Sequence, residues 1–181
     1  MVMTSAVEAM VDPWSTVVWT AATCVSTSTA LAALAETCER AALVLGRHAQ
    51  LDEAAFGGLS GIVYRTSSTL LEQACGRTGR RSRRLAEGLA AYAQGMTEVR
   101  RRLDEAVAVA APHLHVAGGR IWSPLRPAGA NDPADAVTAQ GWAAWHEAVE
   151  RWRAARDLEG QVAQEWVRVL DRPVQFESAD R

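Results

Sequence analysis

The residues best suited to chemistry in this sequence are its histidines, cysteines and acidic side chains, and their spacing supports no catalytic site. His113 and His115 have the spacing of a metal-binding pair, but no third and fourth ligand follows at a suitable distance. Glu147 and Glu150 lie one helical turn apart with no nucleophile beside them. The sequence has no Ser/His/Asp order, no glycine-rich phosphate loop and no His-Glu-x-x-His motif. We therefore predict a non-enzymatic protein without a metal, a cofactor or a small-molecule substrate.

The three cysteines are an odd number without a Cys-x-x-Cys pair, which favours buried free thiols. Cys24 and Cys38 would lie about 21 Å apart on one helix, too far for a disulfide. Cys38 lies eighteen residues before Phe56 and Cys75 eighteen residues after Gly57, so a helical turn there would place both thiols at one level. Two interpretations stay open for this pair: a disulfide in an oxidising compartment, or two small apolar residues in register.

A cluster of arginines is the main charged feature. All 19 basic residues are arginine, and a net charge of −2 gives no global attraction to nucleic acid or to an anionic membrane. The cluster has no interleaved aromatic residues and has glutamates nearby, which favours a solvated helix face and disfavours nucleic acid. Docking of an acidic partner is the intermediate interpretation. The residues of this partner-binding candidate are Arg77, Arg80, Arg81, Arg83 and Arg84.

The elements that would position these residues are helices. Alanine and leucine dominate a hydrophobic fraction of 49%, a composition typical of helical proteins. We predict an all-α fold: a single domain over residues 1–181, shaped as an elongated helical bundle. Its core is an αα-hairpin with arms at about 13–50 and about 59–111, followed by a C-terminal helix at about 133–171. The tail at 172–181 is expected to be frayed.

The turn between the two arms is predicted at Phe56-Gly57-Gly58, where glycines free the backbone for a tight bend. In the second arm, Gly76 and Gly79 are candidate kinks. The apolar pattern is weak from Leu59 to Ala74. It sharpens to a four-three repeat at Leu85, Leu89, Tyr92, Met96, Val99, Leu103, Ala106 and Ala110.

Proline and glycine fill the loop at 112–132, and within it residues 113–124 resemble a β-hairpin turned at Gly118-Gly119. The final helix carries a tryptophan stripe that includes Trp142, Trp145 and Trp152. The simplest interpretation is that these indoles pack in the core. If the helix does not fold back, they become anchors for a partner helix.

A helix, a Trp-x-Gly turn and a second helix form the signature of the WXG-type hairpins of type VII (ESX-like) secretion, and Phe56-Gly57-Gly58 resembles that turn with Phe for Trp. The chain is similar in particular to the N-terminal helical targeting domain of actinobacterial secreted toxins. That domain carries a loop of the form Leu-x-Val-x-Gly-Gly-Arg-Ile-x-x-Pro, which residues 114–124 resemble as LHVAGGRIWSP. GWAAW at 141–145 opens a helix in the corresponding place.

The resemblance implies a helical interaction module that pairs with another helical protein, as a homodimer or a heterodimer. It would act as a secreted substrate, a targeting domain or a partner of a toxin. Family members often carry a Tyr-x-x-x-Asp/Glu export signal, whose candidate remnant here is Phe176 with Asp180. The alternative function is an immunity protein or toxin chaperone, and a weaker one is a helical nucleic-acid-associated regulator.

The sequence also bears on location. The N-terminus lacks the cationic region of a secretory signal peptide, since the first basic residue is Arg40. The sequence has no charge-free run of about 18 apolar residues, so it does not predict a membrane span. We expect synthesis in the cytoplasm without a cleavable signal, and export by a type VII-like route.

Overall fold

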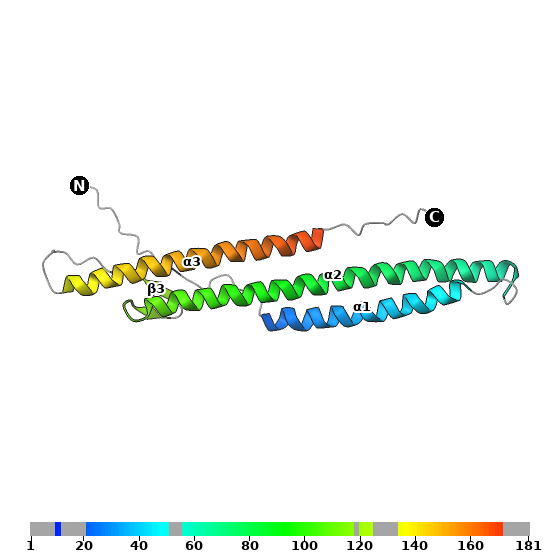
Figure 1. The fold of residues 1–181 in the computed structure, drawn as a ribbon, viewed down its shortest axis with the longest axis horizontal. Helices are drawn as coiled ribbons and strands as arrows, with labels where there is room; N and C mark the ends of the chain where they lie inside the picture. Colours follow the sequence, from blue (N-terminus) through cyan, green and yellow to red (C-terminus); the bar gives the residue numbers. More distant parts are fainter. Residues whose placement is uncertain (1–9, 12–20, 51–55, 118–119, 125–133, 172–181) are drawn as a thin grey trace. The chain divides into compact units, whose positions relative to one another are not determined.

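The computed structural model describes residues 10–11, 21–50, 56–117, 120–124 and 134–171, and these residues are mostly helical. Three helices account for most of them: α1 (Ala21–Ala49), α2 (Gly58–Ala110) and α3 (Ala134–Asp171) (Figure 1). The all-α class is therefore confirmed. The bounds of α2 and α3 lie within about one residue of the predicted ones. The predicted start of the first helix near Pro13 and the predicted frayed tail lie outside the described residues.

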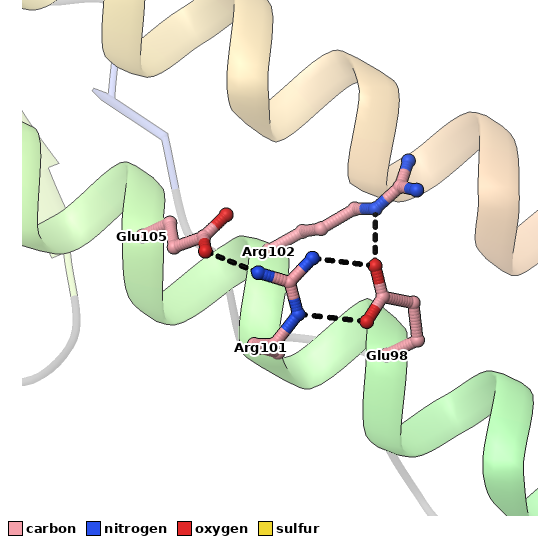
Figure 2. A network of polar contacts seen from close by, with 4 residues as sticks. All are labelled: Glu98, Arg101, Arg102 and Glu105. Carbon is pink, nitrogen blue, oxygen red and sulfur yellow. Dashed lines mark hydrogen bonds and ion pairs between the residues drawn. The ribbon is translucent and has the colours of Figure 1, made fainter.

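Helix α2 runs for 53 residues without interruption. Gly76 and Gly79, expected as candidate kinks, both lie inside it. Ion pairs between residues three or four apart support its exposed side, and Figure 2 shows the largest group. There, Arg101 and Arg102 both donate hydrogen bonds to Glu98, and Arg101 also reaches Glu105. Pairs of this kind on an exposed helix face add only modestly to helix stability, because solvent screens them.

Two compact units divide the chain. The sheet unit comprises Met1–Thr20 and Gln94–Ala163, and the α1 unit comprises Ala21–Ala93 and Gln164–Arg181. Helices α2 and α3 each contribute residues to both units. The prediction of a single domain over 1–181 stays a prediction.

A small antiparallel sheet belongs to the sheet unit. Its strands are β1 (Met10–Val11), β2 (Val116–Ala117) and β3 (Arg120–Trp122), in the order β1-β3-β2. Val116 pairs with Ile121 in the β2–β3 ladder, so two strands form within the loop predicted to resemble a β-hairpin, although its glycine turn lies outside the described residues. The pairing of Val11 with Ile121 adds β1, a strand that the sequence did not suggest.

The core of the sheet unit contains large side chains. Val99 and Leu103 on α2 are fully buried, and Ile121 of β3 joins a cluster with Trp145 of α3. Gly95 lets α3 approach α2 closely, since a Cβ atom there would lie 2.5 Å from the Val162 side chain. The four-three repeat predicted for α2 therefore faces the core over the sheet unit. Its buried members there are Met96, Val99, Leu103, Ala106 and Ala110.

Candidate interaction surface

The contact between α1 and α2 in the α1 unit is made by small side chains. A Cβ atom at Gly79 would lie 3.3 Å from both the carbonyl oxygen of Ala35 and the Cβ atom of Cys38. The hydroxyl of Ser28 donates a 2.8 Å hydrogen bond to the carbonyl of Ala86, so the two backbones are close there as well. We call this contact the small-residue seam. Within the part of the α1 unit that the structure describes, the buried apolar residues are all small: Cys24, Ala35, Ala86 and Ala93.

A hydrogen-bonded ion pair flanks the small-residue seam. Arg83 donates two hydrogen bonds to the Glu39 carboxylate, with the closer nitrogen and oxygen 2.5 Å apart. The hydrogen bond from Arg83 lowers the pKa of Glu39, and the same bond raises the pKa of Arg83. Both side chains are exposed to solvent, so the pair fixes the relative register of the helices more than it adds stability.

The residues around the predicted turn motif show why glycine stands there. Gly58 has a φ of 74°, in the left-handed region that favours glycine, and it is the first residue of α2. Arg65 donates a 3.0 Å hydrogen bond to the carbonyl of Phe56. The Phe56 ring packs edge-on against Tyr64, whose hydroxyl lies 3.0 Å from His48 Nδ1 on α1. Phe56 itself stays 44% exposed.

Large apolar side chains of the α1 unit lie outside the small-residue seam. Leu59, Val63 and Leu70 on α2 are 78%, 58% and 61% exposed. Leu43 on α1 is exposed to a similar degree. Among the described residues, the large apolar side chains recorded as exposed all belong to this unit, and the full set is Val25, Leu34, Leu43, Val44, Phe56, Leu59, Ile62, Val63, Tyr64, Leu70, Leu71, Val167 and Leu170.

An open groove follows one side of the α1–α2 contact. It has a volume of about 480 Å³, and Gly46 and Gly76 are among the residues that line it. Glu39 and Glu72 line it together with Arg47 and Arg80, so its walls carry both signs of charge. Nothing in this mixture selects one class of small molecule.

Helix α3 contacts a different face of α2 in the α1 unit. A Cβ atom at Gly88 would lie 2.6 Å from the side chain of Val169 and 3.2 Å from the Trp166 ring. The rings of Tyr92 and Trp166 lie 6.2 Å apart. This face of α2 is therefore covered as far as Gly88 by the last turns of α3.

The predicted arginine cluster lies in the middle of α2. Arg77, Arg80 and Arg81 are exposed and make no ion pair with any described residue. Arg83 is tied to Glu39, and Arg84 is half-buried with a partner of its own. The structure thus separates the five predicted arginines into three available for a partner and two engaged within the chain.

The predicted tryptophans belong to the sheet unit. Trp145 is buried beside Ile121, and Trp142 packs against the same cluster. Trp152 is half-buried, with the Arg156 guanidinium 5.6 Å from its ring centre. Trp145 therefore serves the core, and a role of these indoles in partner binding stays a prediction.

Two further features predicted from the sequence, the cysteine pair and the export-signal remnant, do not form part of a site in the structure. Cys38 and Cys75 are half-buried free thiols on α1 and α2, and their pairing stays a prediction. Phe176 and Asp180 lie outside the described residues. Among the residues that the structure describes, no group of three or more His, Cys, Asp or Glu side chains could hold a metal ion.

The small-residue seam was not among the features predicted from the sequence. Its signal was present: Gly61, Ser68, Cys75, Gly79, Ser82 and Ala86 recur at steps of three, four or seven along α2. A pattern of large apolar residues does not reveal this signal, because two helices in close contact need small side chains more than apolar ones. The interlock of Gly88 and Gly95 with valines of α3 was missed for the same reason.

Comparison with family models, with curated proteins and with solved structures found no match to this chain. None of the described helices combines the length and apolarity needed to cross a bilayer. Support for a function therefore comes from the surface itself and from the resemblance of the turn and loop motifs.

Proposed function

We propose that this chain is a non-enzymatic helical interaction module of a type VII (ESX-like) secretion pathway. It acts there as a secreted substrate, as a targeting domain or as the heterodimerisation partner of a toxin. In this proposal α1 and α2 are the arms of an αα-hairpin, turned at Phe56-Gly57-Gly58, within an elongated bundle. The partner is another helical protein.

One observation carries the proposal: among the described residues of the α1 unit, the fully buried apolar side chains are all small, while many of the large ones are exposed. Burial of apolar area contributes about 25 cal/mol per Å², so an exposed Leu or Val forgoes most of the stabilisation it could supply. Contiguous exposed apolar surface typically marks a site for another protein. A helical layer built this way is suited to packing against a second helical layer.

The motifs indicate which kind of helical protein this is. The Phe-Gly-Gly turn at 56–58 and the loop at 114–124 resemble those of the WXG-type secreted modules. A partly exposed Phe56 beside Tyr64 is compatible with a turn that a partner recognises.

The experiment is co-expression with each small helical protein encoded beside this chain, in a host with an active type VII system. We expect one neighbour to co-purify in a fixed ratio and the pair to appear in the culture medium. A strain with an inactivated secretion complex is the control, and there the pair should stay in the cells. A chain that stays monomeric and stable with every neighbour, and is never exported, contradicts the proposal.

A further inference from the structure

One face of α2 runs through the whole α1 unit, and α3 covers only its end. Residues at steps of four and three along a helix lie on one face. Leu59, Val63, Leu70, Arg77 and Arg81 are related to Gly88 by such steps. Gly88 lies against Val169 of α3, and α3 ends two residues later at Asp171. We call the part of this face from Leu59 to Arg81 the open track.

The open track is apolar at one end. Leu59, Val63 and Leu70 on it are each more than half exposed, and none of the described residues covers them. The small-residue seam with α1 occupies the opposite side of α2, through Gly79 and Ala86. The open track therefore continues the face on which α3 packs, on the side that α1 leaves free, and Arg77 and Arg81 lie between its apolar end and Gly88.

The other end of the open track is basic. Arg77 and Arg81 lie on it, and both are exposed without an ion pair to a described residue, while Arg80 lines the groove on the α1 side. The track itself carries no acidic residue between Leu59 and Arg81, since Glu72, the acidic residue of that stretch, lines the groove on the α1 side. Its charge is unbalanced, and a complementary surface must be acidic.

We propose that the open track binds one amphipathic helix of a second polypeptide chain, apolar along one half and rich in Asp and Glu along the other. The partner helix continues the path of α3 along α2. Leu59 and Arg81 are 22 residues apart, which sets a contact length of about 33 Å at about 1.5 Å per residue. The inference rests on the proposed function and specifies the chemistry of its partner.

A second copy of this chain is a poorer occupant. In a symmetrical dimer through the open track, Arg77 and Arg81 of one copy would face solvent, apolar residues or the arginines of the other. The track offers them no carboxylate. Like charges across an interface disfavour association, so a different chain fits the track better.

The test uses the full chain and two synthetic fluorescent peptides of 22 residues with high helix propensity. Both carry leucines at steps of three and four in one half. The other half carries glutamates in the acidic peptide and arginines in the basic peptide. Fluorescence anisotropy measures binding at about 50 and about 300 mM salt. We expect the acidic peptide to bind at least about tenfold more tightly than the basic one, and to weaken as salt rises.

Paired variants locate the binding. Val63→Asp with Leu70→Asp, and separately Arg77→Glu with Arg81→Glu, should each weaken the acidic peptide at least about tenfold. The charge-reversed variant should also gain affinity for the basic peptide, which a merely damaged fold would not. The matched controls are Val25→Asp with Leu43→Asp on α1, and Arg151→Glu with Arg153→Glu on α3, which should leave binding unchanged. Circular dichroism checks that every variant keeps its helices.

Several results would overturn the proposal. They are equal affinity for both peptides, insensitivity to the track variants, and self-association that Val63→Asp with Leu70→Asp abolishes. Binding that appears only after residues 172–181 are removed would assign the track to those residues instead. A neighbour that co-purifies equally well with the track variants would end this inference but leave the proposed function standing. If the chain binds the acidic peptide but is never exported, this inference stands and the proposed function fails.

Discussion

The two compact units fill their helix contacts with side chains of different size. The sheet unit buries Leu103, Val99 and Ile121, while the buried apolar side chains among the described residues of the α1 unit are Cys and Ala. The difference shows that the apolar content of a segment does not predict whether its large side chains form a buried core. Many large apolar side chains of the α1 unit are exposed and others, such as Leu85 and Leu89, are only half-buried, while its helices meet through glycine, serine and alanine. One unit buries large apolar side chains, and the other has the exposed apolar surface that the proposed partner would cover.

The largest expected effect contrasts one leucine from each unit. Leu103→Ala should lower the free energy of unfolding by about 3 kcal/mol, because it leaves a cavity in a fully buried site. Leu70→Ala should change it by less than about 0.5 kcal/mol, because Leu70 is mostly exposed. Urea unfolding followed by circular dichroism measures both. Equal losses for the two variants would mean that the α1 unit hides a core of its own.

A cysteine at position 79 tests the small-residue seam. The ideal Cβ position of Gly79 lies 3.3 Å from the Cys38 Cβ, close to the separation found in disulfides, about 3.8 Å. Gly79→Cys, with Cys75→Ala to remove the competing thiol, should oxidise to an internal disulfide worth about 2 kcal/mol. Thiol titration and mass spectrometry detect it.

The control for this cross-link is Gly160→Cys, since no described atom lies within 4 Å of a Cβ atom there. That thiol should stay reduced under the same conditions. A Gly79→Cys chain that keeps both thiols free would show that α1 and α2 do not meet in this register.

Two glycines of the sheet unit should respond to alanine with opposite signs. Gly95→Ala should destabilise by about 1–3 kcal/mol, because its methyl group would press into Val162, a stiff β-branched side chain. Gly160→Ala should stabilise by up to about 1 kcal/mol, because it lies in a helix interior with open space around it. Thermal unfolding compares them. Stabilisation by both would indicate that α3 does not lie close to α2 at Gly95.

The smallest expected effect is a pH dependence in α2. Hydrogen bonds from Arg101 and Arg102 lower the pKa of Glu98 from 4.5 to about 2 (Figure 2). Because the folded pKa lies below the unfolded one, the contribution of Glu98 is complete above about pH 4.5 and disappears as the pH falls toward 2. Helicity measured between pH 5 and 2 should fall less in Glu98→Gln than in the unsubstituted chain. Asp157→Asn is the control, and a matching change there would assign the effect to general titration.

Much of the helical architecture could be predicted because its signals are local. Helix ends at Gly58 and after Ala110 coincide with a glycine turn and with Pro112, and the Leu85 to Ala110 repeat is a strong periodic pattern. The loop around Gly118-Gly119 predicted a β-hairpin, and β2 and β3 stand on either side of that pair. Each of these features can be predicted from residues that lie close together in the sequence.

The remainder depends on residues far apart in the sequence. The pairing of Val11 with Ile121 adds β1, a short segment without a strand pattern of its own, to the predicted hairpin. The exposure of Leu59, Val63 and Leu70 depends on which face of α2 meets α1, and that choice is made by Gly79 and Ala86. Small residues give a weak hydropathy signal even where they decide how closely two helices approach.

Hydrogen exchange of the isolated chain, followed by mass spectrometry, tests the contrast between the units most directly, because α2 contributes residues to both. The account predicts that amides of α2 from Gly58 to about Arg80 exchange at least about tenfold faster than those from Met96 to Ala110, since fewer large side chains are buried around them. Addition of a partner that covers the open track should slow the first group and leave the second unchanged. Equal protection along the whole of α2 in the isolated chain would contradict the account.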